Sequence, residues 1–196
     1  IVKQDLLFYS IFAFVIIYSL KIYSESEVFN LKCIIATEDG HKYCVRNRLK
    51  MKEAANLLAR ATGRATHFVN KLYEKYPNEE RVKRLYDNFN PKKVQETLPT
   101  SELTAYSENK GEKMAFCVTK NKKGNQLIDE NTLTFVAIHE LSHIMTKSIG
   151  HTEEFWDNFK FLLQNAVEIG IYKPIDYSKK PKQYCGMKIT DNPYYS

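Results

Sequence analysis

Two histidines and a glutamate stand close together in the C-terminal half of the chain. His139 and His143 are four residues apart, and Glu140 directly follows the first of them. On a helix this spacing puts both rings on one face, with Cβ atoms roughly 5–6 Å apart, which is within reach of one ion. Zinc accepts imidazole nitrogen readily. The spacing is that of the H-E-x-x-H pattern, in which the histidines bind zinc and the glutamate acts as general base.

A third ligand is expected soon after this pair, because a catalytic zinc needs three protein ligands and an open position. His151 follows Gly150, a residue that favours the end of a helix. We predict His151 as the third ligand, with Glu153 and Glu154 as fallback ligands. A fourth protein ligand, from Glu153, His41 or a cysteine, would instead make the zinc structural.

Two helices must position these side chains. The first is strongly apolar, with Asp129 or Asn131 as a natural N-cap and Gly150 as a natural end. The second is expected between Thr152, another N-cap, and Gly170, and it carries its apolar residues on one face. The third histidine would then lie at a fixed elbow between two packed helices.

An uncharged apolar run marks the start of the chain. Residues 6–20 carry no charge and lie between Asp5 and Lys21. A spanning helix needs about 20 residues, so the run is short but sufficient if Lys21 reaches the interface. We predict a transmembrane anchor over residues 1–23, contacting the lipid bilayer through residues 6–23, and hence a single-pass membrane protein. A secretory signal peptide and an amphipathic or buried helix are the alternatives.

The four cysteines are Cys33, Cys44, Cys117 and Cys185, and none forms a C-x-x-C pair that would indicate a cysteine zinc site. Cys33 and Cys44 flank a predicted hairpin. Facing each other there, they could form a disulfide in an oxidising compartment. Buried free thiols are the alternative in a reducing compartment.

The net charge of +6 is concentrated in one region. Residues 41–93 hold fourteen Lys and Arg against five Asp and Glu, a net charge of +9. Apolar residues recur there at helical spacing up to Pro77, with His67 expected in the core, and a second helix follows. This basic helical part suits lipid headgroups, a capsid or other acidic protein surface, or nucleic acid. Nucleic acid has weak support, because no binding motif is present, and a solvated helix face is the alternative.

The remaining segments complete an α+β fold. An alternating, β-rich run predicts a strand over residues 113–120, after a polar connection over 97–113. Residues 113–170 thus combine a strand with the metal-site helices, and residues 171–196 form an irregular tail. With 43% hydrophobic and 27% charged residues, the chain can pack a core, which excludes a disordered or collagen-like chain. We predict one mostly helical domain with a small β-sheet over residues 24–196.

The H-E-L-S-H run, His151 and the Phe155-Trp156 pair resemble the WLM-type and SprT-like zincin metallopeptidases. Those families share H-E-x-x-H, a third histidine and a following Phe-Trp pair. The resemblance implies a zincin-like domain with Zn²⁺ held by three histidines, His139, His143 and His151. It also implies that Glu140 is the catalytic base, and that a strand beside the active-site helix holds extended substrate, with residues 114–118 as the candidate.

This resemblance predicts a membrane-anchored zinc metallopeptidase that hydrolyses peptide bonds. Glu140 would take a proton from the attacking water and pass it to the leaving amine. Tyr106 and Tyr172 are candidate oxyanion partners. A catalytically silent structural or tethering protein on the same scaffold is the alternative, and a helix with two surface histidines and no metal is the least specific interpretation.

From about residue 41 to the C-terminus, the chain also resembles metallopeptidase-like virion proteins of large nucleocytoplasmic DNA viruses. This resemblance implies a virion protein in the inner viral membrane or capsid layer, such as a minor capsid component. Such viruses run their own disulfide chemistry, so cysteine pairing would not follow from the cellular compartment alone.

Overall fold

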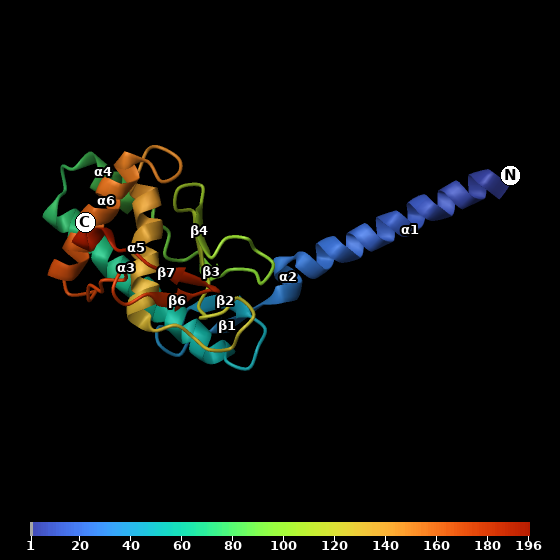
Figure 1. Cartoon of the computed structure of the whole chain (residues 1–196), viewed down its shortest axis with the longest axis horizontal. Helices are drawn as coiled ribbons and strands as arrows, with labels where there is room; N and C mark the ends of the chain where they lie inside the picture. The colour runs from blue at the N-terminus through green and yellow to red at the C-terminus, as the bar shows by residue number, and fades with distance from the viewer. Residues whose placement is uncertain (1) are drawn as a thin grey trace.

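A long apolar helix, α1 (Val2–Glu25), projects away from the folded part of the chain, as Figure 1 shows. The computed structural model describes residues 2–196, so Ile1 of the predicted anchor lies outside the described residues. By length and composition, the 21-residue stretch Asp5–Glu25 can cross a membrane, and none of its apolar window is buried. At 1.5 Å per residue it measures about 31 Å, close to the ~30 Å hydrocarbon core of a bilayer. The helix ends two residues beyond the predicted limit of the anchor.

A mixed five-stranded sheet forms one layer of the domain. Its strands lie in the order β1 (Leu31–Ile35), β2 (Lys42–Arg46), β3 (Val94–Glu96), β5 (Lys113–Phe116) and β4 (Ala105–Glu108). The β1–β2 hairpin is antiparallel, and its directly opposed residues Cys33 and Cys44 form a disulfide. β2, β3 and β5 run parallel to one another, and β4 closes one edge antiparallel to β5.

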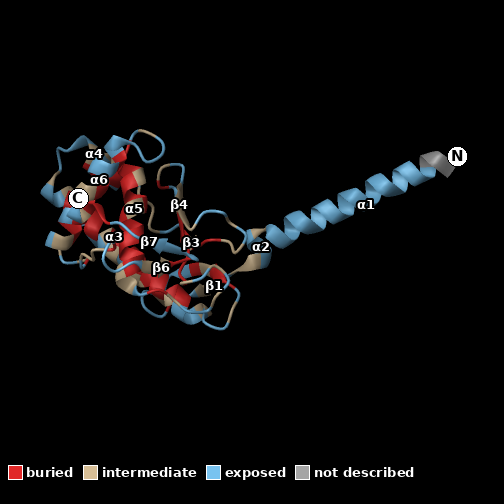
Figure 2. Cartoon of the chain, in the orientation of Figure 1, coloured by how far each residue is buried: buried red, intermediate tan, exposed pale blue. Residues whose placement is uncertain are grey.

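Helices cover one face of this sheet. After the short α2 (Glu27–Asn30) come α3 (Met51–Lys75), α4 (Glu80–Asn88), α5 (Glu130–Met145) and α6 (Glu153–Glu168). α5 packs against α3, α4, α6 and β4, and Figure 2 shows that it is buried along its length. The domain is therefore α+β, as predicted, and more of its residues lie in helices than in strands. His67, expected in the core, is exposed on α3, so that prediction was wrong.

The C-terminal segment folds back onto the domain. β6 (Lys182–Tyr184) and β7 (Met187–Ile189) form a hairpin, and a 3-10 turn, η1 (Pro193–Tyr195), follows. A disulfide joins the turn of this hairpin, at Cys185, to Cys117 directly after β5. The tail predicted as irregular over residues 171–196 thus contains regular structure. Its strands are three residues long, too short for a periodic pattern to show them.

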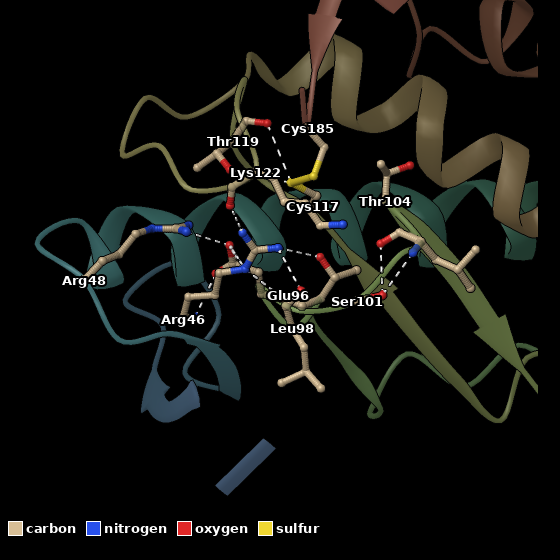
Figure 3. Close-up of polar contacts among 12 residues, drawn as sticks. Arg46, Arg48, Glu96, Leu98, Ser101, Thr104, Cys117, Thr119, Lys122 and Cys185 are labelled. Carbon is tan, nitrogen blue, oxygen red and sulfur yellow. Dashed lines mark hydrogen bonds and ion pairs between the residues drawn. A yellow bond between two sulfur atoms is a disulfide. The ribbon is translucent and has the colours of Figure 1, made fainter. Parts of the chain in front are cut away.

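A buried charged cluster joins β2, β3 and the loop after β5. The Glu96 carboxylate accepts a hydrogen bond from the Arg46 backbone N–H at 2.8 Å and pairs with the Arg48 guanidinium at 2.7 Å. The Arg46 guanidinium donates to the carbonyl groups of Thr97 and Lys122. Figure 3 shows this cluster beside the disulfide of the C-terminal hairpin. Because buried charges are tolerated only when they are paired and hydrogen-bonded, the cluster fixes how these segments meet.

Two strand predictions differ from the structure. β4 lies inside the stretch predicted as a polar connection, and the strand predicted over residues 113–120 ends at Phe116. β4 is polar because it is an edge strand that is only partly buried. β5 lies between β3 and β4, so it has no free edge. A substrate strand cannot pair with it, so the expectation that residues 114–118 hold extended substrate is wrong.

Removal of the Cys117–Cys185 disulfide should destabilise the domain more than removal of Cys33–Cys44. The first bridges a sequence separation of 68 residues and the second one of 11. On chain-entropy grounds the losses are about 4 and about 3 kcal/mol. We expect the Cys117→Ala/Cys185→Ala variant of the full chain in detergent to unfold at lower urea concentration than Cys33→Ala/Cys44→Ala, as followed by circular dichroism. The reverse order would contradict this ranking.

Candidate metal centre

Three histidines come together at the C-terminal half of α5. His139 and His143 lie one turn apart on α5, and His151 lies in the loop before α6. The Nε2 atoms of His139 and His151 are 3.1 Å apart, and one ring nitrogen from each histidine lies within 4.8 Å of the other two. Nitrogen ligands of a tetrahedral zinc are about 3.3 Å apart. The donor set therefore fits a single zinc ion.

The surroundings favour the neutral form of the two helical histidines. Burial, followed by the nearby histidines, lowers the pKa of His139 to about 3. Burial, followed by His151 and the Lys110 ammonium, lowers the pKa of His143 to about 4. A metal ligand must offer a neutral imidazole nitrogen, so both rings are in the binding form at neutral pH.

Glu140 lies one residue after the first histidine and is only 4% exposed. Burial alone raises the pKa of its carboxyl group to about 8. A cation held by the neighbouring histidines would favour the charged carboxylate. A glutamate in this position is thus poised to take up and release a proton near neutral pH.

Phe155 of α6 forms a common apolar wall for the three histidines. Its ring centroid lies 4.9 Å from that of His139, 4.3 Å from that of His143 and 4.7 Å from that of His151. The neighbouring Trp156 lies 5.6 Å from the His151 ring and is 44% exposed. Close packing restricts ring rotation. The Phe-Trp pair, known from the sequence only as part of a resemblance, therefore has a positioning role.

Glu154 holds the loop that carries His151. Its carboxylate accepts hydrogen bonds from the Lys147 N–H at 2.9 Å, the Ser148 N–H at 3.1 Å and the Ser148 hydroxyl at 2.8 Å. These backbone and side-chain bonds lower the pKa of Glu154 to about 2. The Ser148 hydroxyl also contacts the hydroxyl of Thr152, the N-cap of α6, at 2.7 Å. Glu154, predicted as a fallback ligand, is thus engaged in ordering the loop.

Two cations hold the C-terminal end of α5. The Lys110 ammonium group donates to three backbone carbonyls, those of His143, Thr146 and Ser148, at 2.8 to 3.4 Å. The Arg84 guanidinium donates to the carbonyl of Met145. Free carbonyls at a helix end accept such donors, and the helix dipole favours positive charge there. α5 ends at Met145, five residues before the predicted Gly150, and these two cations satisfy carbonyls at and after that end.

The other candidate residues lie elsewhere or are engaged. His41 belongs to the β1–β2 turn, where it pairs with an aspartate, and Glu153 is exposed on α6. All four cysteines are in disulfides. Tyr172 is buried and its hydroxyl accepts from Asn192, whereas Tyr106 lies half-buried on β4. Among the described residues, the group of possible metal ligands consists of the three histidines.

By fold and site, the chain is an α+β protein with a candidate three-histidine metal centre and a helix long enough to span a membrane. It is 31% identical to "Uncharacterized protein R325" of Acanthamoeba polyphaga mimivirus over 154 residues, which is 76% of this chain and 78% of that protein. The chain therefore belongs to the same protein family as the mimivirus protein.

Two further relatives come from iridescent viruses. "Uncharacterized protein 042R" of Invertebrate iridescent virus 3 is 36% identical over 85 residues, which is 42% of this chain and 50% of that protein. "Uncharacterized protein 136R" of Invertebrate iridescent virus 6 is 38% identical over 72 residues, 35% of this chain and 38% of that protein. No protein-family model and no solved structure matches the chain. The predicted relation to proteins of large DNA viruses is confirmed, and the metallopeptidase class stays a prediction.

The substitution Glu154→Ala should weaken zinc binding more than Glu153→Ala. It removes three hydrogen bonds from the loop that carries His151, and loss of groups that orient a ligand typically lowers metal affinity about 10–100-fold. Glu153 is the matched control, because it lies in the same turn, carries the same charge and is exposed. Competition with a chromophoric chelator measures both affinities. Equal losses in the two variants would show that the Glu154 contacts do not position the ligand.

Proposed function

We propose that this protein is a membrane-anchored zinc metallopeptidase of the zincin type. The observation that carries the proposal is the convergence of three histidine nitrogens, with a buried glutamate, Glu140, directly after the first histidine in the sequence. Three protein ligands without a fourth described Asp, Glu or Cys nearby are typical of catalytic rather than structural zinc. The donor set comes from one helix and the adjoining loop, both of which are held by polar contacts.

The chemistry would be divided between the ion and one side chain. Zinc, when bound, supplies Lewis-acid chemistry: it acidifies water and polarises a carbonyl group. Glu140 would accept the proton of the attacking water and then donate it to the leaving amine. A group with a pKa near the working pH is suited to both transfers, and burial of Glu140 shifts its pKa in that direction.

The substrate would be an extended polypeptide held along β4. This strand packs against α5 and pairs with β5 on one side, and no described strand lies on its other side. An edge strand offers free N–H and C=O groups to which a peptide can add as a further strand. β4 thus replaces residues 114–118 as the candidate substrate strand, and Tyr106 lies on it.

The location we propose is a viral membrane or the adjoining capsid layer. α1 would be the single transmembrane anchor, and the family includes proteins of large DNA viruses. Residues 41–93 offer an acidic capsid partner fewer free basic side chains than the sequence indicates. Nine basic side chains of that region already bond to groups of this chain: Arg46, Arg48, Arg60, Arg64, Lys71, Lys75, Arg81, Arg84 and Lys93.

The full chain should contain about one zinc ion, and His139→Ala should lose it, because two imidazoles seldom hold zinc alone. His67→Ala is the matched control, since His67 is an exposed histidine on α3, far from the cluster in sequence. Elemental mass spectrometry of the purified protein gives the metal content. Absence of zinc from the unaltered chain would overturn the proposal.

The substitution Glu140→Gln should retain zinc and lower the rate of peptide cleavage about 10²–10⁴-fold, because it removes the proton acceptor but none of the ligands. Cleavage of an unfolded protein mixture, with new termini identified by mass spectrometry, gives the rate. Zinc without any cleavage by the unaltered chain would instead favour the catalytically silent structural protein. Cleavage by Glu140→Gln at the original rate would exclude Glu140 as the base.

A further inference from the structure

The face of the sheet opposite the main helices carries the junction with α1. Cross-strand pairing aligns Cys33, Cys44, Gln95, Ala115 and Tyr106 in one row across the sheet. Apart from Ala115, these side chains are exposed or half-buried. Their neighbours on the central strands, Tyr43, Val45, Val94, Met114 and Phe116, belong to the core. We call the face that bears this row the outer face. Figure 1 shows α2 and α1 on this side of the domain and α3, α5 and α6 on the other.

The junction between α1 and the domain is tied by side-chain contacts. The Glu27 carboxylate of α2 accepts hydrogen bonds from Gln95 at 2.8 Å and from Lys113 at 2.7 Å, which places α2 over the outer face. The Asn30 side chain donates to the carbonyl of Ser24 at 2.7 Å, at the end of α1. The domain therefore does not hang from a flexible linker: its outer face is turned toward the membrane that α1 would cross.

Strongly exposed apolar side chains surround this junction. Their exposed fractions are 81%, 57%, 93% and 58% for Val28, Phe29, Leu49 and Leu103. The last two lie in the loops that follow the parallel strands β2 and β3, and these loops leave the sheet at the end where α2 meets β1. We call these four residues the collar. Single exposed apolar residues are common, but a group of this kind around one point indicates a contact surface.

The unpaired charges near the collar are more positive than negative. Lys21, Lys32 and Lys50 are exposed, and none of them is in an ion pair among the described residues. Of the exposed acids on the same segments, Glu27 is paired with Lys113, which leaves Glu25 and Glu102. Apolar side chains flanked by lysines match the layer where acyl chains meet anionic headgroups.

We propose that the collar docks on the headgroup layer of the same bilayer that α1 crosses, with anionic lipid as its partner. The inference rests on the membrane anchor of the proposed function. In this arrangement the sheet lies against the lipid surface, and a peptide added to β4 runs along that surface. The substrate class would then be extended polypeptide close to the membrane.

A fluorescence experiment on the full chain tests this docking. Because all described cysteines are in disulfides, a single introduced thiol can be labelled selectively. We would place an environment-sensitive NBD probe at Leu49→Cys and, as a matched control, at Ile149→Cys, which is equally exposed at 90% but lies in the loop between α5 and α6. Both proteins are reconstituted into phosphatidylcholine vesicles with and without phosphatidylserine, and spin-labelled lipid serves as quencher.

We expect the Leu49 probe to shift to the blue and to be quenched at least about twofold more than the Ile149 probe, with a larger effect in the anionic vesicles. Flotation of the vesicles shows separately whether α1 anchors the protein in the bilayer. Protein that floats while both probes stay in water would overturn the docking and leave the anchor intact. Protein that does not float would overturn the anchor itself. A blue shift in detergent that grows with protein concentration would mean that the collar binds a second copy, and would also overturn the inference.

Discussion

The helix that carries two of the candidate metal-binding histidines must be surrounded by other elements on every side. From Thr132 to Met145, every residue of α5 is buried except His139 and His143. A helix that is apolar around its whole circumference is stable only inside a core, so α3, α4, α6 and β4 surround it. The two half-buried histidines lie where the surrounding elements leave α5 accessible to solvent. The candidate site is thus the place where the core of the domain reaches solvent.

Such a gap between the surrounding elements would leave polar backbone groups without partners, and charged side chains supply these partners, one from a distant position and one from the start of the next helix. The Lys110 ammonium satisfies carbonyls at the end of α5, and the Glu154 carboxylate satisfies N–H groups of the next loop. One cation and one anion therefore hold the two sides of the elbow that presents His151. This division follows from the polarity of helix ends, where carbonyls face one way and N–H groups the other.

Local signals in the sequence were sufficient for the helices and for the pairing of histidines along one of them. Thr152 is an N-cap, as predicted, and of the two residues predicted for the other helix, Asp129 and Asn131, the first is the N-cap. Such caps can be predicted because capping depends on residues two or three positions away. β4 was missed because its four residues, which show no apolar alternation, become a strand only through pairing with β5. The Cys117–Cys185 pair could not be derived, since connectivity does not follow from cysteine spacing. The contacts of Lys110 and Glu154 were also missed, because they form only when the chain has folded around the end of α5.

The two faces of the sheet have different physical requirements, and this difference links the fold to its proposed setting. The inner face packs on α3 and α5 and supports the candidate metal centre, and the buried Arg46–Glu96 pair fixes the central strands. The outer face has no helix other than the short α2 among the described elements. An antiparallel or mixed sheet tolerates one solvated face when that face is polar. Ile35, on the edge strand β1 of this sheet, is an apolar residue of the outer face and is nevertheless 70% exposed. Such exposure is expected when another apolar phase, here the proposed lipid surface, covers that face.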